Sequence, residues 1–188
     1  MSGNLAGMRK RLAELLLEKS FLRGEMTLTS GKRSSYYFDC KQTALHPEGA
    51  FLLGTLLLER LLPEVEGIGG MTLGADPLVS AVSVVSYQQN RPLPAFIVRK
   101  KPKGHGTGQY LEGMANFRAG QKVAVLEDVV TTGGSLLDAV RRARDGGLAV
   151  SQIICILDRE EGGSQRAADE GFRLESVFTA SDLLGDRI

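Results

Sequence analysis

The stretch VAVLEDVVTTGGS, residues 123–135, decides how this chain folds. Its first residues form an apolar run that predicts a buried strand, and two adjacent acids, Glu127 and Asp128, stand at the predicted end of that strand. Hydroxyl and glycine residues follow, just before a predicted helix over residues 134–144. In open parallel sheets, ligands bind where strands lead into helices, so we expect a binding site here.

Strand and helix patterns alternate on both sides of this stretch. Because the strands are continuously apolar, the pattern predicts an α/β fold with a central parallel sheet flanked by helices, in a single domain over residues 1–188. The predicted elements are helices over residues 4–19, 76–87 and 134–144, a helix that starts at Pro47, a hairpin over residues 27–39 with its turn at Ser30-Gly31, and strands over residues 67–71, 94–100, 122–128, 152–159 and 173–179.

Composition excludes several classes of protein. The 23 basic and 22 acidic residues give a net charge of +1, which argues against broad attraction to nucleic acid. Cys40 and Cys155 are far apart and lack the paired spacing of a zinc site or a redox dithiol. No apolar run approaches the roughly 20 residues of a membrane span, and the N-terminal segment turns polar too early for a signal peptide. We therefore expect a cytoplasmic protein with no membrane or nucleic-acid partner.

The acids and the glycine loop together predict a site for a phosphorylated ligand. Helix N-termini and exposed backbone N–H groups favour phosphate, and two carboxylates beside them suit a diol or a metal. Taken alone, the glycines are typical of an ordinary turn, and the acids of a strand that meets water. The stretch matches neither G-x-x-x-x-G-K-[ST] nor G-x-G-x-x-G, so common ATPases and nicotinamide enzymes are disfavoured.

This stretch resembles the phosphoribosyl-pyrophosphate (PRPP) motif of type I phosphoribosyltransferases. The resemblance implies that Glu127 and Asp128 contact the ribose hydroxyls, while the following loop wraps the 5′-phosphate. The loop residues are Val129, Val130, Thr131, Thr132, Gly133, Gly134 and Ser135. The resemblance also implies the type I phosphoribosyltransferase fold, with a small N-terminal hood formed mainly by residues 1–45.

Residues 98–113, VRKKPKGHGTGQYLEG, resemble the mobile catalytic loop of orotate phosphoribosyltransferases. By this resemblance Arg99, Lys100, Lys103 and His105 bind PRPP. The last three are catalytic because they stabilise the departing pyrophosphate, and Asp128 is catalytic because it positions the ribose. Glycines in the loop, which we place at residues 100–113, suit opening and closing. By itself the segment is also typical of a solvated basic surface loop, and a lone histidine is more often a surface residue.

Two further segments, residues 27–39 and 157–163, resemble the hood and the orotate-contacting segment of the same family. Arg159 is suited to pair with the orotate carboxylate, and Thr131 and the aromatic pair Tyr37-Phe38 to hold its ring. The alternatives are an Arg159 that only bridges to a neighbouring acid, Glu160 or Glu161, and an aromatic pair that belongs to the core.

The chain departs from the family pattern at two positions where some members carry lysine. They are Thr29 in the hood and Gly74 in the loop after the first core strand. We therefore expect the loop after the first core strand to approach pyrophosphate through the backbone N–H groups of residues 72–76.

The resemblance implies transfer of the 5-phosphoribosyl group from PRPP to orotate, giving orotidine 5′-monophosphate and pyrophosphate, a step of pyrimidine synthesis. It implies Mg²⁺ as cofactor, with no metal site made by the protein alone. It also implies a homodimer in which the loop of one subunit closes over the site of the other. The alternatives are a purine or uracil phosphoribosyltransferase and a PRPP-sensing regulator without activity.

Overall fold

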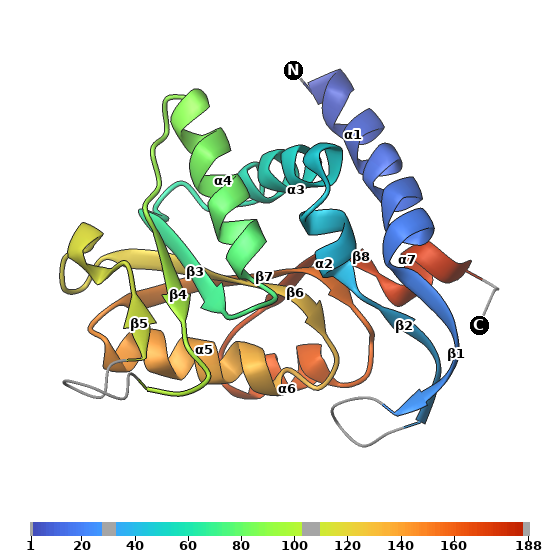
Figure 1. The fold of residues 1–188 in the computed structure, drawn as a ribbon. Helices are drawn as coiled ribbons and strands as arrows, with labels where there is room; N and C mark the ends of the chain where they lie inside the picture. The colour runs from blue at the N-terminus through green and yellow to red at the C-terminus, as the bar shows by residue number, and fades with distance from the viewer. Residues whose placement is uncertain (1, 28–32, 103–109, 186–188) are drawn as a thin grey trace.

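A computed structural model describes residues 2–27, 33–102 and 110–185 of the chain. A six-stranded sheet runs through its middle in the order β5-β4-β3-β6-β7-β8 (Figure 1). The strands are β3 (Gly67–Met71), β4 (Ala95–Val98), β5 (Leu111–Glu112), β6 (Lys122–Val130), β7 (Ala149–Asp158) and β8 (Leu174–Thr179). Only β5 is antiparallel to its neighbour. The predicted α/β fold with a central parallel sheet is confirmed, and the short edge strand β5 is an addition to it.

Helices cover both faces of the sheet (Figure 1). On one side lie α1 (Ser2–Leu15), α3 (Pro47–Leu58) and α4 (Asp76–Gln88), and on the other α5 (Gly134–Asp145) and α6 (Gly163–Asp169). Short helices α2 (Cys40–Ala44) and α7 (Ala180–Leu184), a π-helical turn (Leu16–Ser20) and a 3₁₀ turn (Met114–Asn116) complete the described elements. None of the described helices is long and apolar enough to cross a membrane.

The two faces of the sheet have separate hydrophobic cores because strand side chains alternate in direction. Ala124 and Leu126 of β6 join the core beneath α1, α3 and α4, whereas Val123 and Val125 join the core beneath α5. All four side chains are completely buried. The continuous apolar run in the sequence is therefore the mark of a strand that is covered on both sides.

The N-terminal hairpin starts earlier than predicted. Its strands are β1 (Phe21–Thr27) and β2 (Arg33–Phe38), so the first strand begins six positions before residue 27. The ring centroids of Phe21 and Phe38 lie 5.2 Å apart, and this contact anchors the first residue of β1 against the last of β2. The predicted turn at Ser30-Gly31 and the departure at Thr29 lie outside the described residues.

Strand β6 ends later than predicted. It continues through Val130, because Val129 pairs with Leu157 and Val130 with Asp158 of β7. Glu127 and Asp128 therefore lie inside the strand rather than at its end. Their side chains consequently start from opposite faces of the sheet, which shapes the site described below.

Glycines in β3 make room for aromatic rings. A Cβ atom at Gly69 would lie 2.2 Å from the ring of Phe96, and one at Gly67 would lie 2.4 Å from the ring of Phe117. These two rings meet edge to face at 5.5 Å between centroids. The glycines in GIGGM thus serve packing of the strand.

Gly69→Ala should lower the free energy of unfolding by about 1–3 kcal/mol, because the new methyl group overlaps the Phe96 ring. Gly7→Ala is the matched control, since Gly7 is exposed in α1 and no other side chain lies within 4 Å of where its new methyl group would stand. That change should raise stability by roughly 0.5–1 kcal/mol. Urea unfolding of the three proteins measures both effects. A midpoint for Gly69→Ala at or above that of the wild type would contradict the packing argument.

Candidate active site

Four loops meet at one edge of the sheet. They follow β3, β4, β6 and β7, and because these strands are parallel, their carboxyl ends lie together. The described parts of these loops carry Lys100, Thr131 and Arg159, which were predicted from the sequence to bind PRPP or orotate, and Glu127 and Asp128 lie near the end of β6. The topology thus brings segments that are far apart in the chain to one place.

Glu127 is an unusual carboxylate because it is buried without full hydrogen bonding. It is 4% exposed, and no described group forms a hydrogen bond with its Oε2 atom. Burial, with the nearby charge of Asp128 as a second cause, raises its pKa to about 8, although a hydrogen bond with Ser135 opposes the shift. Such a group is poised to accept a hydroxyl donor or a cation from a ligand.

Asp128 lies against the loop that follows β3. Its Oδ1 atom accepts a hydrogen bond of 2.8 Å from the N–H of Val129. A Cβ atom at Gly74 would lie 2.5 Å from that same oxygen. The departure from the family pattern at Gly74 therefore has a steric reason, since any side chain there would displace Asp128 or the loop.

The loop after β3 offers fewer backbone donors than predicted. The N–H groups of Thr72, Ala75 and Asp76 donate to the carbonyls of Val98 (2.9 Å), Met71 (3.1 Å) and Leu73 (3.3 Å). The loop also contains a cis peptide bond between Thr72 and Leu73. Within the described structure, the N–H groups of Leu73 and Gly74 have no backbone acceptor in this loop. These two groups can therefore donate to an anion.

The loop between β6 and α5 is the segment for which the sequence predicts a cradle for an anion. Gly133 has φ of 75°, a left-handed conformation that glycine adopts without strain, and α5 begins at the next residue. The N-terminus of this helix favours negative charge. Val130 is buried beside Gly163, where a Cβ atom would lie 2.3 Å from Val130 Cγ1, so any contact of Val130 with PRPP comes from its backbone.

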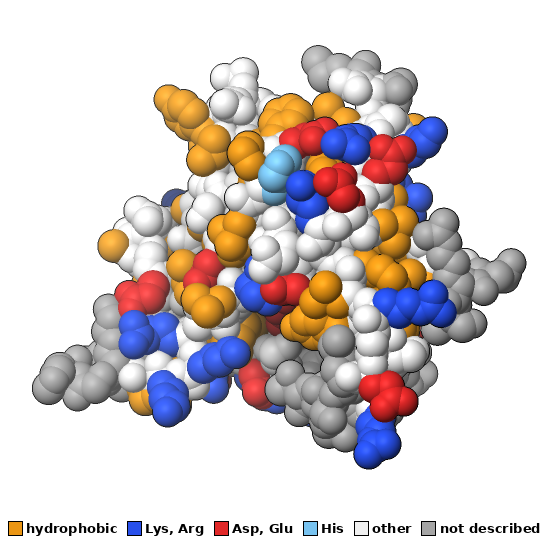
Figure 2. Space-filling model, turned by 45° about the vertical axis from the view of Figure 1, so that its right-hand side comes forward, with side chains coloured by type: hydrophobic (Ala, Val, Ile, Leu, Met, Phe, Trp, Pro, Cys, Tyr) orange, Lys and Arg blue, Asp and Glu red, His pale blue; other side chains and the backbone are white. Residues whose placement is uncertain are grey.

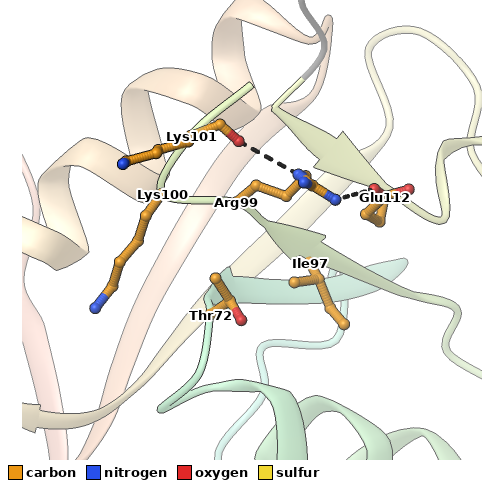
Figure 3. Close-up of a pocket in the computed structure, with 6 residues that line it drawn as sticks. All are labelled: Thr72, Ile97, Arg99, Lys100, Lys101 and Glu112. Atoms are coloured by element: carbon orange, nitrogen blue, oxygen red, sulfur yellow. Dashed lines mark hydrogen bonds and ion pairs between the residues drawn. The ribbon is translucent and has the colours of Figure 1, made fainter. Parts of the chain in front are cut away.

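Basic residues line a pocket of about 420 Å³ beside this edge (Figure 3). Its lining residues are Thr72, Ile97, Arg99, Lys100, Lys101 and Glu112. Arg99 turns toward Glu112, with Nη1 and Oε1 3.0 Å apart, whereas Lys100 extends away from that pair. Lys100 and Lys101 therefore carry the positive charge that the pocket presents. The predicted residues Lys103 and His105 lie outside the described part of the chain.

Arg159 lies where the loop after β7 meets the hairpin. Its Nε atom donates to Glu161 Oε1 at 2.8 Å, and its Nη2 atom donates to Ser34 Oγ at 2.9 Å. The guanidinium also lies 4.5 Å from the centroid of the Tyr36 ring. The bridge to Glu161 that the sequence left open is present, whereas Glu160 instead accepts hydrogen bonds from Ser181.

The aromatic surface differs from the prediction. Phe38 is 1% exposed and packs in the core with Phe21, so it offers no face to a ligand. Tyr37 is half-buried, as its position on the opposite side of β2 requires. The ring that lies against Arg159 is that of Tyr36, and the prediction of Tyr37-Phe38 as a flat surface is corrected accordingly.

Sequence reasoning missed three residues of the site, which are Ser34, Tyr36 and Lys41. Lys41 Nζ lies 2.5 Å from Asp39 Oδ1. Burial acts to lower the pKa of Lys41, but the hydrogen bond with Asp39 and the charge of Asp128 outweigh it and raise the pKa. A cation thus lies near Asp128, yet no sequence pattern separates Lys41 from a surface lysine.

The raised pKa of Glu127 predicts that stability falls as pH rises. The folded protein keeps this proton up to about pH 8, whereas the unfolded chain releases it near the ordinary value of 4.5. Between these values the folded state binds more protons, so the free energy of unfolding decreases with pH. Urea unfolding at about pH 5 and about pH 8 should show a larger loss for the wild type than for Glu127→Gln. Equal losses in both proteins would show that Glu127 is ionised across this window.

Comparison with curated proteins identifies close relatives along almost the whole chain, although no family model matches it. Orotate phosphoribosyltransferases of Nostoc sp. and Thermosynechococcus vestitus are 47% and 46% identical to it, over 97% of this chain and 88% and 96% of those proteins. That of Sorangium cellulosum is 43% identical over 99% of this chain and 98% of its own length.

Solved structures agree with these relatives. Mycobacterium tuberculosis orotate phosphoribosyltransferase in complex with PRPP has a TM-score of 0.75 and 35% identity, and the two chains overlap over 94% of this chain and 98% of that one. The orotate phosphoribosyltransferase of Aeropyrum pernix has a TM-score of 0.78 and 31% identity, over 94% of this chain and 97% of that one. Adenine phosphoribosyltransferase of Trypanosoma brucei has a TM-score of 0.69 and 16% identity, over 95% of this chain and 82% of that one. At this identity the likeness shows the fold alone. With 47% identity over 97% of its length to such an enzyme, the chain belongs to the orotate phosphoribosyltransferase family.

Proposed function

We infer that this protein transfers the 5-phosphoribosyl group from PRPP to orotate, which yields orotidine 5′-monophosphate and pyrophosphate. The observation that carries the inference is the meeting, at one edge of the sheet, of the buried Glu127 and its half-buried neighbour Asp128, a glycine loop before α5 and the arginine Arg159. These groups match the ribose, the phosphate and the carboxylate of the two substrates.

For PRPP, we propose that the 5′-phosphate binds the backbone of residues 131–134 and the N-terminus of α5. The ribose hydroxyls donate to Glu127 and Asp128. The pyrophosphate lies over the N–H groups of Leu73 and Gly74. The Lys100 that meets it comes from the second subunit of the dimer proposed below. Each part of PRPP then meets a group of opposite charge or matching hydrogen-bonding character.

In the reaction, the bond between ribose C1 and the pyrophosphate oxygen breaks, and its electron pair leaves with pyrophosphate. Lys100 stabilises that charge, together with Lys103 and His105 of the predicted loop. C1 then carries positive character, and Glu127 and Asp128 hold the sugar in place for attack by orotate N1 from the opposite face. Orotate reacts as the dianion, whose N1 proton has already passed to solvent, so no proton remains to be removed from N1 after the new bond forms.

Mg²⁺ is the cofactor that we propose for this site. In the described ranges, no three His, Cys, Asp or Glu side chains form a group that holds a metal alone. The Oε2 atom of Glu127 lacks a described partner, and the charge of Asp128 is near enough to raise the pKa of Glu127. Mg²⁺ commonly combines one or two carboxylates with substrate phosphates. Glu127 and Asp128 therefore fit a cation that arrives with PRPP, where it would neutralise pyrophosphate charge.

For orotate, we propose that Arg159 binds the carboxylate, with Thr131 and the half-buried Tyr37 near the ring. This ion pair is directional, because a guanidinium and a carboxylate form two parallel hydrogen bonds. The hairpin contact through Ser34 then places the hood beside the acceptor site.

We propose a cytoplasmic homodimer with shared active sites. Large apolar side chains are exposed on α3 (Phe51), on α4 (Val84 and Tyr87) and in the loop after β3 (Leu73), as expected of a surface that a second copy covers. Charges of both signs are interspersed on the face in Figure 2, which supports the expectation of no nucleic-acid partner.

The purified chain should consume orotate only when PRPP and Mg²⁺ are both present, and it should not consume adenine or uracil at comparable rates. The variant with Glu127→Gln and Asp128→Asn should lose at least about 100-fold in turnover, because the ribose is no longer held. Circular dichroism checks that this variant remains folded. Consumption of another base in preference to orotate, or near-normal turnover of the folded variant, would overturn the proposal.

Mixing two inactive variants tests whether the site is shared. Lys100→Ala damages the donated loop and Asp128→Asn damages the receiving site. A mixed dimer then has one site with both lesions and one with neither, provided that Lys100 acts across the interface. After subunit exchange, the mixture should regain on the order of a quarter of wild-type activity, since half of the randomly paired dimers are mixed. Mass spectrometry verifies the exchange, and activity no higher than that of the parents would place Lys100 in its own subunit's site.

A further inference from the structure

Arg159 is almost completely buried. Its side chain is 2% exposed, and arginine is seldom fully buried unless it is paired. Within the described structure, three side chains contact its guanidinium. Ser34 and Tyr36 come from the hairpin, and Glu161 comes from the same loop as Arg159.

The contacts divide the guanidinium into two edges. Oε1 of Glu161 lies 2.8 Å from Nε and 2.8 Å from Nη2, so this one oxygen occupies the edge between them. Ser34 Oγ accepts from Nη2 at 2.9 Å. Among the described residues, none forms a hydrogen bond with Nη1. The edge between Nη1 and Nη2 is therefore the one on which a carboxylate can form two hydrogen bonds, with the Ser34 hydroxyl as the group to be displaced.

Glu161 itself belongs to a loop whose neighbouring residues are anchored. Asp158 accepts hydrogen bonds from the N–H of Glu160 at 2.9 Å and from Ser164 Oγ at 2.6 Å. Glu160 accepts from the N–H of Ser181 at 2.8 Å and from its hydroxyl at 2.6 Å. Each of these contacts restrains the loop without touching Arg159. Glu161 is thus the acidic residue of this loop that transmits the restraint to the guanidinium.

We propose that Glu161 is a positioning residue that holds the Nε–Nη2 edge of Arg159 and so presents the Nη1–Nη2 edge to the carboxylate of orotate. The inference rests on the proposed function, because it concerns the same acceptor site. It assigns Glu161 a role in selecting orotate over bases that lack a carboxylate.

The sign of the effect separates this role from simple electrostatics. Glu161 is negative, so removal of its charge alone would strengthen the binding of an anion. If Glu161 merely competed with the substrate for Arg159, truncation would likewise improve affinity. Weaker orotate binding after truncation is expected only if the geometry imposed by Glu161 matters more than its charge.

The test is a double-mutant cycle of Glu161→Ala and Arg159→Ala, with Glu161→Gln as the conservative variant. Steady-state kinetics give kcat and the KM values for orotate and PRPP, and calorimetry compares orotate with uracil, which lacks the carboxylate. Glu161→Ala should raise the KM for orotate roughly tenfold, with the KM for PRPP and the uracil affinity unchanged within about twofold. Glu161→Gln, which keeps a hydrogen-bond acceptor for Nε, should recover most of this loss.

The double variant should bind orotate no more weakly than Arg159→Ala alone, because Glu161 acts only through that arginine. Glu170→Ala is the control, since it removes a carboxylate from an exposed arginine pair, 2.9 Å from Arg141, elsewhere on the surface. It should leave the KM for orotate unchanged.

A lower KM for orotate in Glu161→Ala would overturn the proposal, as would equal losses for orotate and uracil or additive losses in the double variant. A wild-type protein that does not consume orotate with PRPP and Mg²⁺ would instead refute the proposed function. If the wild type is active and folded Glu161→Ala matches it, the proposed function stands and the role of Glu161 is rejected.

Discussion

The parallel pairing of β6 with β7 continues past the last residues of both strands, and the candidate site depends on it. Val130 pairs with Asp158 at the end of the ladder. Beyond it, the N–H of Arg159 donates to the carbonyl of Val130 at 2.9 Å, and that of Gly163 to the carbonyl of Thr131 at 3.1 Å. The loop between β6 and α5 and the loop of Arg159 are thus joined by their main chains, and their separation does not depend on flexible side chains.

Local patterns in the sequence were sufficient for the fold class and for most elements. The apolar runs of β6 and β7 are long, and strands of this kind are recognisable because both faces are buried. The ends of the elements were less predictable, since they depend on partners distant in sequence. Strand β6 reaches Val130 only because β7 offers Asp158, and β1 starts at Phe21 only because Phe38 packs against it.

The same division holds for the site. The acid pair and the glycine loop are contiguous in sequence, so their residue types alone predict a phosphate site. The contact of Arg159 with Ser34 joins positions 125 residues apart, and the approach of Gly74 to Asp128 joins the loop after β3 to strand β6. The hydrophobic periodicity of a single segment does not predict contacts between segments that are far apart in the chain. The burial of Phe38 was equally hidden, because a pair of adjacent aromatic residues in a strand must point to opposite faces, and the sequence alone does not tell which one faces the core.

The close approach of Gly74 to Asp128 also constrains how this chain can exchange parts with its relatives. A loop that carries lysine at this position needs either a shifted Asp128 carboxylate or a different backbone path, because even a methyl group at Gly74 would overlap the carboxylate. A chimera that takes such a loop must therefore accommodate a change at Asp128 or in the main chain around position 74. The effect of a substitution at Gly74 depends on the acid across from it, so the two positions are expected to be epistatic. Divergence at this corner of the fold is expected to change both sides of the contact together rather than Gly74 alone.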